Sequence, residues 1–141
     1  MSHEVKVKLF DGGKMPEYKT KGAVCADCYA RGEYIVPAGE RRLVPLGFAV
    51  ELPHCYEMVV RPRSGFSAKG VDVAVGTIDG DYRGEVSACV INTLSESVLI
   101  KNGDRICQIA VREVPEISFT AVSELSATER GGNGFGSTGV K

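Results

Sequence analysis

Residues 76–85, Gly-Thr-Ile-Asp-Gly-Asp-Tyr-Arg-Gly-Glu, set the architecture that we expect for this chain. Apolar, β-branched runs flank them, at residues 71–75 before and 86–91 after. A strand, a polar turn and a second strand predict a β-hairpin. A simple hairpin turn needs only an Asp-Gly or Asn-Gly pair, and a polar turn of solvated acids would explain these residues taken alone. Because Asp79 directly follows the apolar Ile78, however, a rigid strand should hold its carboxylate.

The rest of the chain predicts an all-β fold. Short apolar runs recur about every 8–12 residues and are separated by turn signals such as Pro37-Ala38-Gly39, which is typical of a sandwich or barrel. A sustained helical stripe is absent, although residues 123–129 could form one or two helical turns. The runs lie at residues 5–9, 34–36, 42–52, 56–60, 97–100 and 105–114.

Length and composition predict one globular domain. The chain has 141 residues, of which 43% are hydrophobic and 25% charged, and its net charge is −1. This balance gives no global bias toward nucleic acid or membrane. The first residues lack the apolar region of a signal peptide, and no apolar run approaches the ~20 residues of a membrane span. Five cysteines, an odd number, argue against a closed disulfide set, so we expect an intracellular protein of the cytoplasm or nucleus.

Cys25 and Cys28 form a Cys-x-x-Cys pair that could indicate zinc or redox chemistry. Structural zinc usually takes four ligands, commonly two such pairs. The other cysteines stand alone in the sequence, and the adjacent His54 and Cys55 lack a useful spacing. We therefore favour packing of small side chains within a strand, and we expect Asp27 to pair with an arginine.

Two further segments carry groups that suit phosphate. Arg63 offers a planar fork, Ser64 a hydroxyl and Gly65 an accessible backbone N–H, although residues 61–70 could equally be a basic turn. Gln108, on the strand that follows the turn at 101–104, either fills a hydrogen-bond gap in the core or reaches a ligand.

The end of the chain, residues 130–141, holds five glycines in twelve residues. Its N–H groups, hydroxyls and Arg130 suit a phosphate cradle, but it lacks the Gly-Lys-Ser/Thr end of a Walker loop. Phe135 has no core to join and should stack on something flat. A disordered glycine tail is the alternative. We expect a body at residues 1–129 and a mobile lid at 130–141.

Taken together, these segments resemble the trimeric deoxyuridine triphosphate nucleotidohydrolases (dUTPases), in order and spacing, from residue 23 to 140. Residues 76–85 and the ending Gly-Phe-Gly-Ser-Thr-Gly are highly specific as a pair. The resemblance implies a β jelly roll, a homotrimer with sites at the subunit interfaces, and hydrolysis of dUTP to dUMP and pyrophosphate. That reaction limits uracil incorporation into DNA and supplies dUMP for dTMP synthesis. From the charge and composition we expect no nucleic-acid or membrane partner.

The same resemblance implies the role of each site residue. Asp79 matches the aspartate that activates the attacking water, and Tyr82 matches the ring under the deoxyribose. Phe135 matches the ring that closes over uracil. Mg²⁺ is implied, held mainly by the triphosphate and water. The remaining matches are Gly76, Thr77 and Ile78 for uracil, Arg63, Ser64, Gly65 and Gln108 for phosphates from a second subunit, Ser87 near the substrate, and Arg130, Gly136, Ser137 and Thr138 from a third.

The sequence departs from the family pattern in two places. Cys25 and Cys28 replace the usual Gly and Leu, and Val73 stands where many bacterial relatives have Asn. A dCTP deaminase would share the fold, but its catalytic glutamate, five residues after Gly84, is Cys89 here. A dUTP-sensing interaction module is the alternative from another functional class.

Overall fold

The apolar runs form eleven strands and one short helix in the computed structural model, which describes residues 3–136 and 138–139. The all-β prediction is confirmed, and no helix of the described residues is long and apolar enough to cross a membrane. The elements are β1 (Lys6–Leu9), β2 (Ala26–Tyr29), β3 (Tyr34–Val36), β4 (Arg41–Pro45), β5 (Phe48–Glu51), β6 (Tyr56–Arg61), α1 (Ser64–Ala68), β7 (Val71–Val73), β8 (Gly76–Ile78), β9 (Ser87–Asn92), β10 (Val98–Ile100) and β11 (Arg105–Glu113).

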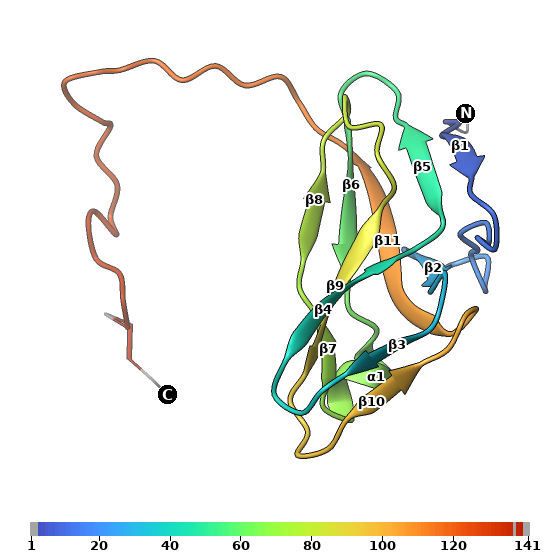
Figure 1. Ribbon diagram of the computed structural model, residues 1–141. Helices are drawn as coiled ribbons and strands as arrows, with labels where there is room; N and C mark the ends of the chain where they lie inside the picture. The colour runs from blue at the N-terminus through green and yellow to red at the C-terminus, as the bar shows by residue number, and fades with distance from the viewer. Residues whose placement is uncertain (1–2, 137, 140–141) are drawn as a thin grey trace.

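The strands pair antiparallel in two larger sheets, ordered β2-β11-β6-β8 and β4-β9-β7, and in the pairs β1-β5 and β10-β3 (Figure 1). Alternate side chains of both larger sheets enter one core: Met58 and Val60 come from β6, Val44 from β4 and Val90 from β9, all at most 2% exposed. This layered arrangement agrees with the expected jelly-roll-like sandwich. In the described part of the chain the sheets do not close into a single hydrogen-bonded barrel.

The expected hairpin is more elaborate than a single turn. Its outer ends do pair, with Val71 opposite Asn92 and Val73 opposite Val90. The chain then leaves that sheet, and Gly76–Ile78 forms β8 at the edge of the other sheet, where it pairs with β6. The expected antiparallel pairing of the two runs is confirmed for β7 and β9, but their connection is longer than a turn because residues 76–78 cross to the other layer. Asp79 does follow a strand directly, as expected.

Beyond β11 the chain leaves the body. We call residues 115–129 the arm and residues 130–141 the tail. The arm and residues 130–136 of the tail lie apart from the strands in the orange-to-red part of Figure 1. Phe119 is 98% exposed and Leu125 88% exposed. The helical turns that residues 123–129 could have formed are absent, and the segment has an irregular backbone with bends. A short helix is stable mainly when its apolar face packs on other elements. No other part of the described chain packs on the apolar side chains of this segment, such as Leu125.

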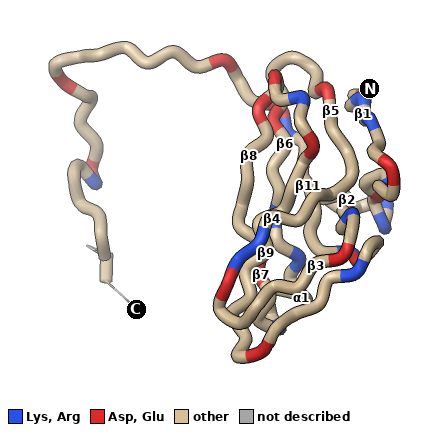
Figure 2. Tube along the Cα trace, viewed as in Figure 1, with Lys and Arg blue, Asp and Glu red and all other residues tan. Residues whose placement is uncertain are grey.

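Charges of both signs are distributed over the body (Figure 2). Most ion pairs lie at the surface, for example Lys6 with Glu51 at 3.2 Å. Exposed pairs of this kind contribute little to stability. Three pairs are less exposed, Arg31 with Glu85 and Asp27 with Arg63 and with Arg105, and they belong to the regions where the sequence predicts the site.

Candidate active site

The loop at residues 79–85 is held in one shape by its own hydrogen bonds. The Tyr82 N–H donates to the Asp79 carbonyl at 3.1 Å, and the Tyr82 hydroxyl donates to the Glu85 carbonyl at 3.1 Å. Arg83 Nη1 donates to the Gly80 carbonyl at 2.7 Å. A Cβ on Gly84 would clash with the Tyr82 hydroxyl, so any other residue there would displace this ring. The loop therefore presents Asp79 and Tyr82 in a fixed relation.

This loop borders a groove of about 310 Å³. Five of its seven lining residues had been predicted from the sequence, namely Thr77, Ile78, Asp79, Tyr82 and Ser87; Leu43 and Glu85 complete it. The Tyr82 side of the groove is open, since this residue is 44% exposed. A carboxylate, hydroxyls and an aromatic face suit a sugar and a water molecule better than they suit an anion.

Glu85 ties the loop to the body, which sequence reasoning missed. Its carboxylate accepts hydrogen bonds from Arg31 Nε at 2.8 Å, from Arg31 Nη2 at 2.7 Å and from the Gly47 N–H at 2.9 Å. The Arg31 guanidinium, with the Gly47 amide, holds the pKa of Glu85 below its usual range despite partial burial. In the sequence 54 residues separate the two partners, so only the β-strand pairing brings them together.

A second group of predicted residues gathers beside β2 and β11. Asp27 Oδ2 lies 3.1 Å from Arg105 Nη1, and Asp27 Oδ1 lies 3.8 Å from Arg63 Nε. The expectation that Asp27 pairs with an arginine is thus confirmed. Arg63 also donates to the Arg105 carbonyl at 3.1 Å, and Gln108 Nε2 donates to the Pro62 carbonyl at 2.9 Å. These contacts fix the path of the chain from β6 into α1.

The residues that follow Arg63 open α1, a five-residue helix where the sequence suggested a basic turn. Ser64 and Gly65 are exposed, and a Cβ on Gly65 would meet no atom within 4 Å. The side chain of Arg63 is 27% exposed, so part of its guanidinium remains accessible. Arg63, Ser64 and Gly65, which we call the Arg63 group, can bind an anion from solvent through the guanidinium charge, the hydroxyl and an accessible backbone N–H.

The groove and the Arg63 group lie at opposite ends of β6. Ile78 pairs with Met58 and Gly76 with Val60, so Asp79 lies at the Tyr56 end of the strand. Four extended residues, about 13 Å at 3.3 Å each, separate Glu57 from Arg61, and Arg63 is farther still. Within one chain, these two halves of the predicted site do not meet.

The tail residues that the structure describes, 130–136 and 138–139, contact neither half. Phe135 is fully exposed, and Arg130 Nε donates within the tail to the Asn133 carbonyl at 2.7 Å. Gly136 and Thr138 are also exposed, whereas Ser137 lies outside the described residues.

A model of the family described as dUTPase matches residues 11–139. The chain belongs to the dUTPase family. It is 46% identical over 142 residues to the deoxyuridine 5'-triphosphate nucleotidohydrolase of Treponema denticola, with 97% of this chain and 99% of the relative covered. The corresponding protein of Caldanaerobacter subterraneus subsp. tengcongensis is 42% identical over 148 residues, covering 99% of this chain and 100% of the relative. The resemblance seen in the sequence is confirmed, and with it the enzyme class, a dUTP diphosphatase.

Solved dUTPases share the fold. The dUTPase of Staphylococcus bacteriophage 80alpha, solved with dUPNHPP, superposes with a TM-score of 0.92 at 25% identity, covering 99% of this chain and 100% of that one. A point mutant of the dUTPase from phage phi11 of S. aureus, in which the coordination of a structural Mg(II) ion was analysed, gives a TM-score of 0.82 at 20% identity, with 86% and 98% covered.

The cysteines of this family member are free, and Cys28 belongs to the core. Cys28 and Cys107 face each other across β2 and β11, at 1% and 0% exposure. Contact with the Cys107 thiol, together with burial, raises the pKa of the Cys28 thiol. A thiol that stays protonated is a poor metal ligand, so the structure supports the packing interpretation of Cys28.

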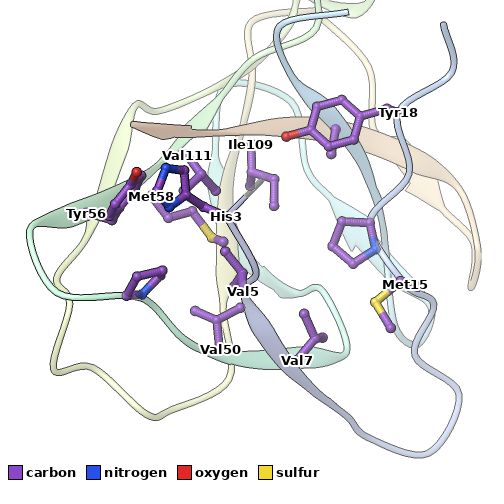
Figure 3. A pocket seen from close by; sticks show the side chains of 13 residues that line it. His3, Val5, Val7, Met15, Tyr18, Val50, Tyr56, Met58, Ile109 and Val111 are labelled. Atoms are coloured by element: carbon purple, nitrogen blue, oxygen red, sulfur yellow. The ribbon is translucent and has the colours of Figure 1, made fainter. Parts of the chain in front are cut away.

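A second hollow, of about 370 Å³, shares no lining residue with the groove (Figure 3). Its walls come from β1, β6 and β11 and are mostly apolar: Val5, Val7, Met58 and Val111 line it, with His3 and Tyr56 at one side. Such a surface suits another apolar segment and does not suit a triphosphate.

Proposed function

We propose that this protein hydrolyses dUTP to dUMP and pyrophosphate, with a water activated by Asp79 attacking the α-phosphate. The observation that carries the proposal is the groove in which Asp79 and Tyr82 are fixed side by side at the end of β8. The family membership and a relative solved with the nucleotide analogue dUPNHPP support the choice of nucleotide.

The edge position of β8 supports recognition of uracil by the backbone. β8 is the last strand of its sheet and pairs on one side only, with β6. Its other edge leaves N–H and C=O groups of Gly76–Ile78 without a strand partner, and such an edge can pair with a planar ligand. Tyr82 then presents its ring to the deoxyribose, where a 2′-hydroxyl would have no room.

Asp79 is the general base of this proposal. It is exposed at the groove, so its carboxylate can accept a hydrogen bond from a water molecule. The water loses its proton to Asp79, its oxygen bonds to the α-phosphorus, and pyrophosphate leaves from the opposite side. In-line attack requires that the triphosphate be held in a fixed position. Positively charged groups outside the groove, such as Arg63 and Arg130, would bind it.

The separation of the two halves along β6 favours a site shared between copies. Asp79 and Tyr82 come from one chain, and Arg63, Ser64, Gly65 and Gln108 from a second. The tail, with Arg130, Phe135, Gly136, Ser137 and Thr138, comes from a third and closes over the nucleotide. Three copies in a closed ring give three equivalent sites.

The arm supports this assembly. Four of its apolar side chains, Ile117, Phe119, Val122 and Leu125, are at least 62% exposed in a single chain. Exposed apolar surface of this kind marks interaction sites. We propose that the homotrimer covers it, and the apolar hollow of Figure 3 is a surface that such a segment would suit.

The residues of the groove fit a weakly held magnesium ion. Asp79, Thr77 and Ser87 offer oxygen atoms only, and no cluster of three carboxylate, His or Cys ligands lies there among the described residues. Mg²⁺ commonly binds through one or two carboxylates, substrate phosphates and water. When bound, it would neutralise charge on the triphosphate, while Arg63 and Arg130 add positive charge from the protein.

Mixed trimers test the shared site. Asp79→Asn chains and chains lacking residues 130–141 are each expected to be inactive alone. Unfolded and refolded together at equal ratio, they should recover about one quarter of wild-type pyrophosphate release. Half of the sites receive Asp79 from a tail-deleted chain, and half of those receive a tail from an Asp79→Asn chain. Background activity in mixed trimers confirmed by mass would refute a tail that acts between chains.

A further inference from the structure

Three metal-binding side chains converge at the base of the arm, at the end of β6 that also carries the groove loop. His54 and Cys55 form the turn between β5 and β6, and Glu116 lies three residues beyond the end of β11. The ligand atoms of the three lie within 4.8 Å of one another, and His54 Nε2 is 3.3 Å from Glu116 Oε1. Elsewhere in the described residues no group of three His, Cys, Asp or Glu side chains meets the same condition.

The backbone of Cys55 is unusual. Its φ is +63°, and only one other described non-glycine residue, Phe135, has a positive φ. Glycine would occupy this turn position freely, whereas a side chain is disfavoured there. The strain is held in place by the Val114 N–H, which donates to the Cys55 carbonyl at 2.7 Å. A strained residue that carries a thiol beside an imidazole and a carboxylate indicates a function for that thiol.

We propose that His54, Cys55 and Glu116 form a zinc site that fastens the arm to the β5–β6 turn. An imidazole nitrogen, a thiolate sulfur and a carboxylate oxygen are the donors that Zn²⁺ takes in proteins. A neutral imidazole with two anionic ligands balances the charge of the ion. Binding releases the Cys55 thiol proton to solvent, forms the Zn–S bond and involves no oxidation.

The exposure of the ligands defines the kind of site. The side chains of His54 and Glu116 are 85% and 80% exposed, and Cys55 is half-buried. Three protein ligands leave a fourth position for water, and flexible, exposed ligands give weaker binding than a closed four-ligand site. The ion would therefore exchange with free zinc in solution and fix the direction in which the arm leaves the body.

The proposed zinc site uses other residues than the proposed reaction does. It shares no residue with the groove, the Arg63 group or the tail. Mg²⁺ prefers an all-oxygen shell and should not compete, so metal binding can be measured in the presence of magnesium and without nucleotide.

The test is a titration of the full chain, freed of metal by chelation, with Co²⁺ as a coloured substitute for zinc. We expect one equivalent per chain, an absorption band from a thiolate–cobalt bond, and displacement by Zn²⁺ but not by Mg²⁺. Cys55→Gly should abolish the thiolate band and, because glycine accepts the positive φ, should raise the thermal midpoint of the metal-free protein. His54→Ala and Glu116→Gln should each weaken binding roughly tenfold or more.

Cys25→Ser is the matched control, because Cys25 is another half-buried thiol but lies outside the cluster. It should bind cobalt as the wild type does. Amide hydrogen exchange gives a second measurement, since zinc should slow exchange at Val114, whose N–H bonds to Cys55. A thiolate band that persists in Cys55→Gly, or the absence of saturable one-to-one binding in the wild type, would overturn the proposal.

Discussion

Glu85→Gln should loosen the loop that presents Asp79 and Tyr82. In the wild type the Glu85 carboxylate accepts two hydrogen bonds from Arg31 and one from the Gly47 N–H, at 2.7–2.9 Å. Glutamine has almost the same shape but only one acceptor oxygen, and its NH₂ group would face the guanidinium donors. The substitution therefore removes the negative charge and leaves donors unpaired without creating a cavity.

The size of the effect follows from these contacts. Losing charge-assisted hydrogen bonds at a buried group costs about 1–3 kcal/mol. Because 21% of the Glu85 side chain remains exposed, solvent reduces this cost, and we expect about 1–2 kcal/mol of the free energy of unfolding to be lost. For a domain of this size that lowers the thermal midpoint by roughly 3–6 °C.

The loss should depend on pH in a defined direction. The folded pKa of Glu85 is held below the ordinary value of 4.5, with the Arg31 hydrogen bonds as the first cause. The stabilisation is therefore fully present above about pH 4.5 and disappears as the pH falls through the folded pKa. The free energies of unfolding of wild type and Glu85→Gln should differ most between pH 5 and 8, by an about constant amount. The two values should become equal as the solution is made acidic.

Urea unfolding at fixed subunit concentration and several pH values measures this difference, and steady-state kinetics measure its effect on the site. We expect kcat/KM for dUTP to fall about tenfold, because a misplaced loop loses orientation of Asp79. Glu17→Gln is the control: Glu17 pairs with Lys19 at 3.2 Å between exposed side chains and should leave kinetics unchanged. Unaltered stability of Glu85→Gln at pH 7 would refute the role given to the Arg31–Glu85 pair.

Other substitutions separate the remaining roles. Tyr82→Ala should narrow the preference for dUTP over UTP, and equal use of both nucleotides by the wild type would contradict the sugar contact. Phe135→Ala should raise KM for dUTP while leaving the urea midpoint unchanged, since the ring is fully exposed; a lower midpoint would show that the ring packs in the free enzyme. Cys28→Ser should lower the free energy of unfolding by about 1–3 kcal/mol by burying a hydroxyl, whereas Cys25→Ser should leave activity and stability intact.

The sequence was sufficient for features that depend on local patterns. Alternating apolar residues predicted the strands, and the order Ile78-Asp79 placed a carboxylate at the end of one, as the structure has it. The pairing of Asp27 with an arginine was predictable because a carboxylate in an apolar strand needs a partner.

The features that were missed arise between distant segments. No local signal joins Glu85 to Arg31 or Glu116 to His54, because strand pairing and the path after β11 decide those contacts. The sequence also did not predict that residues 74–78 cross between the sheets, because the runs that form β7 and β9 have the pattern of two strands of one hairpin. The helical turns predicted at residues 123–129 failed because this part of the arm packs on nothing in its own chain.

The central claim is that Asp79 activates water for attack on dUTP, and pyrophosphate release tests it most directly. With Mg²⁺ and dUTP, the wild type should release pyrophosphate and dUMP in equal amounts. Asp79→Asn should bind dUTP within several-fold of the wild-type affinity and turn over about 10²–10⁴-fold more slowly. Turnover of Asp79→Asn near the wild-type rate, or a wild type that binds dUTP without releasing pyrophosphate, would contradict the account.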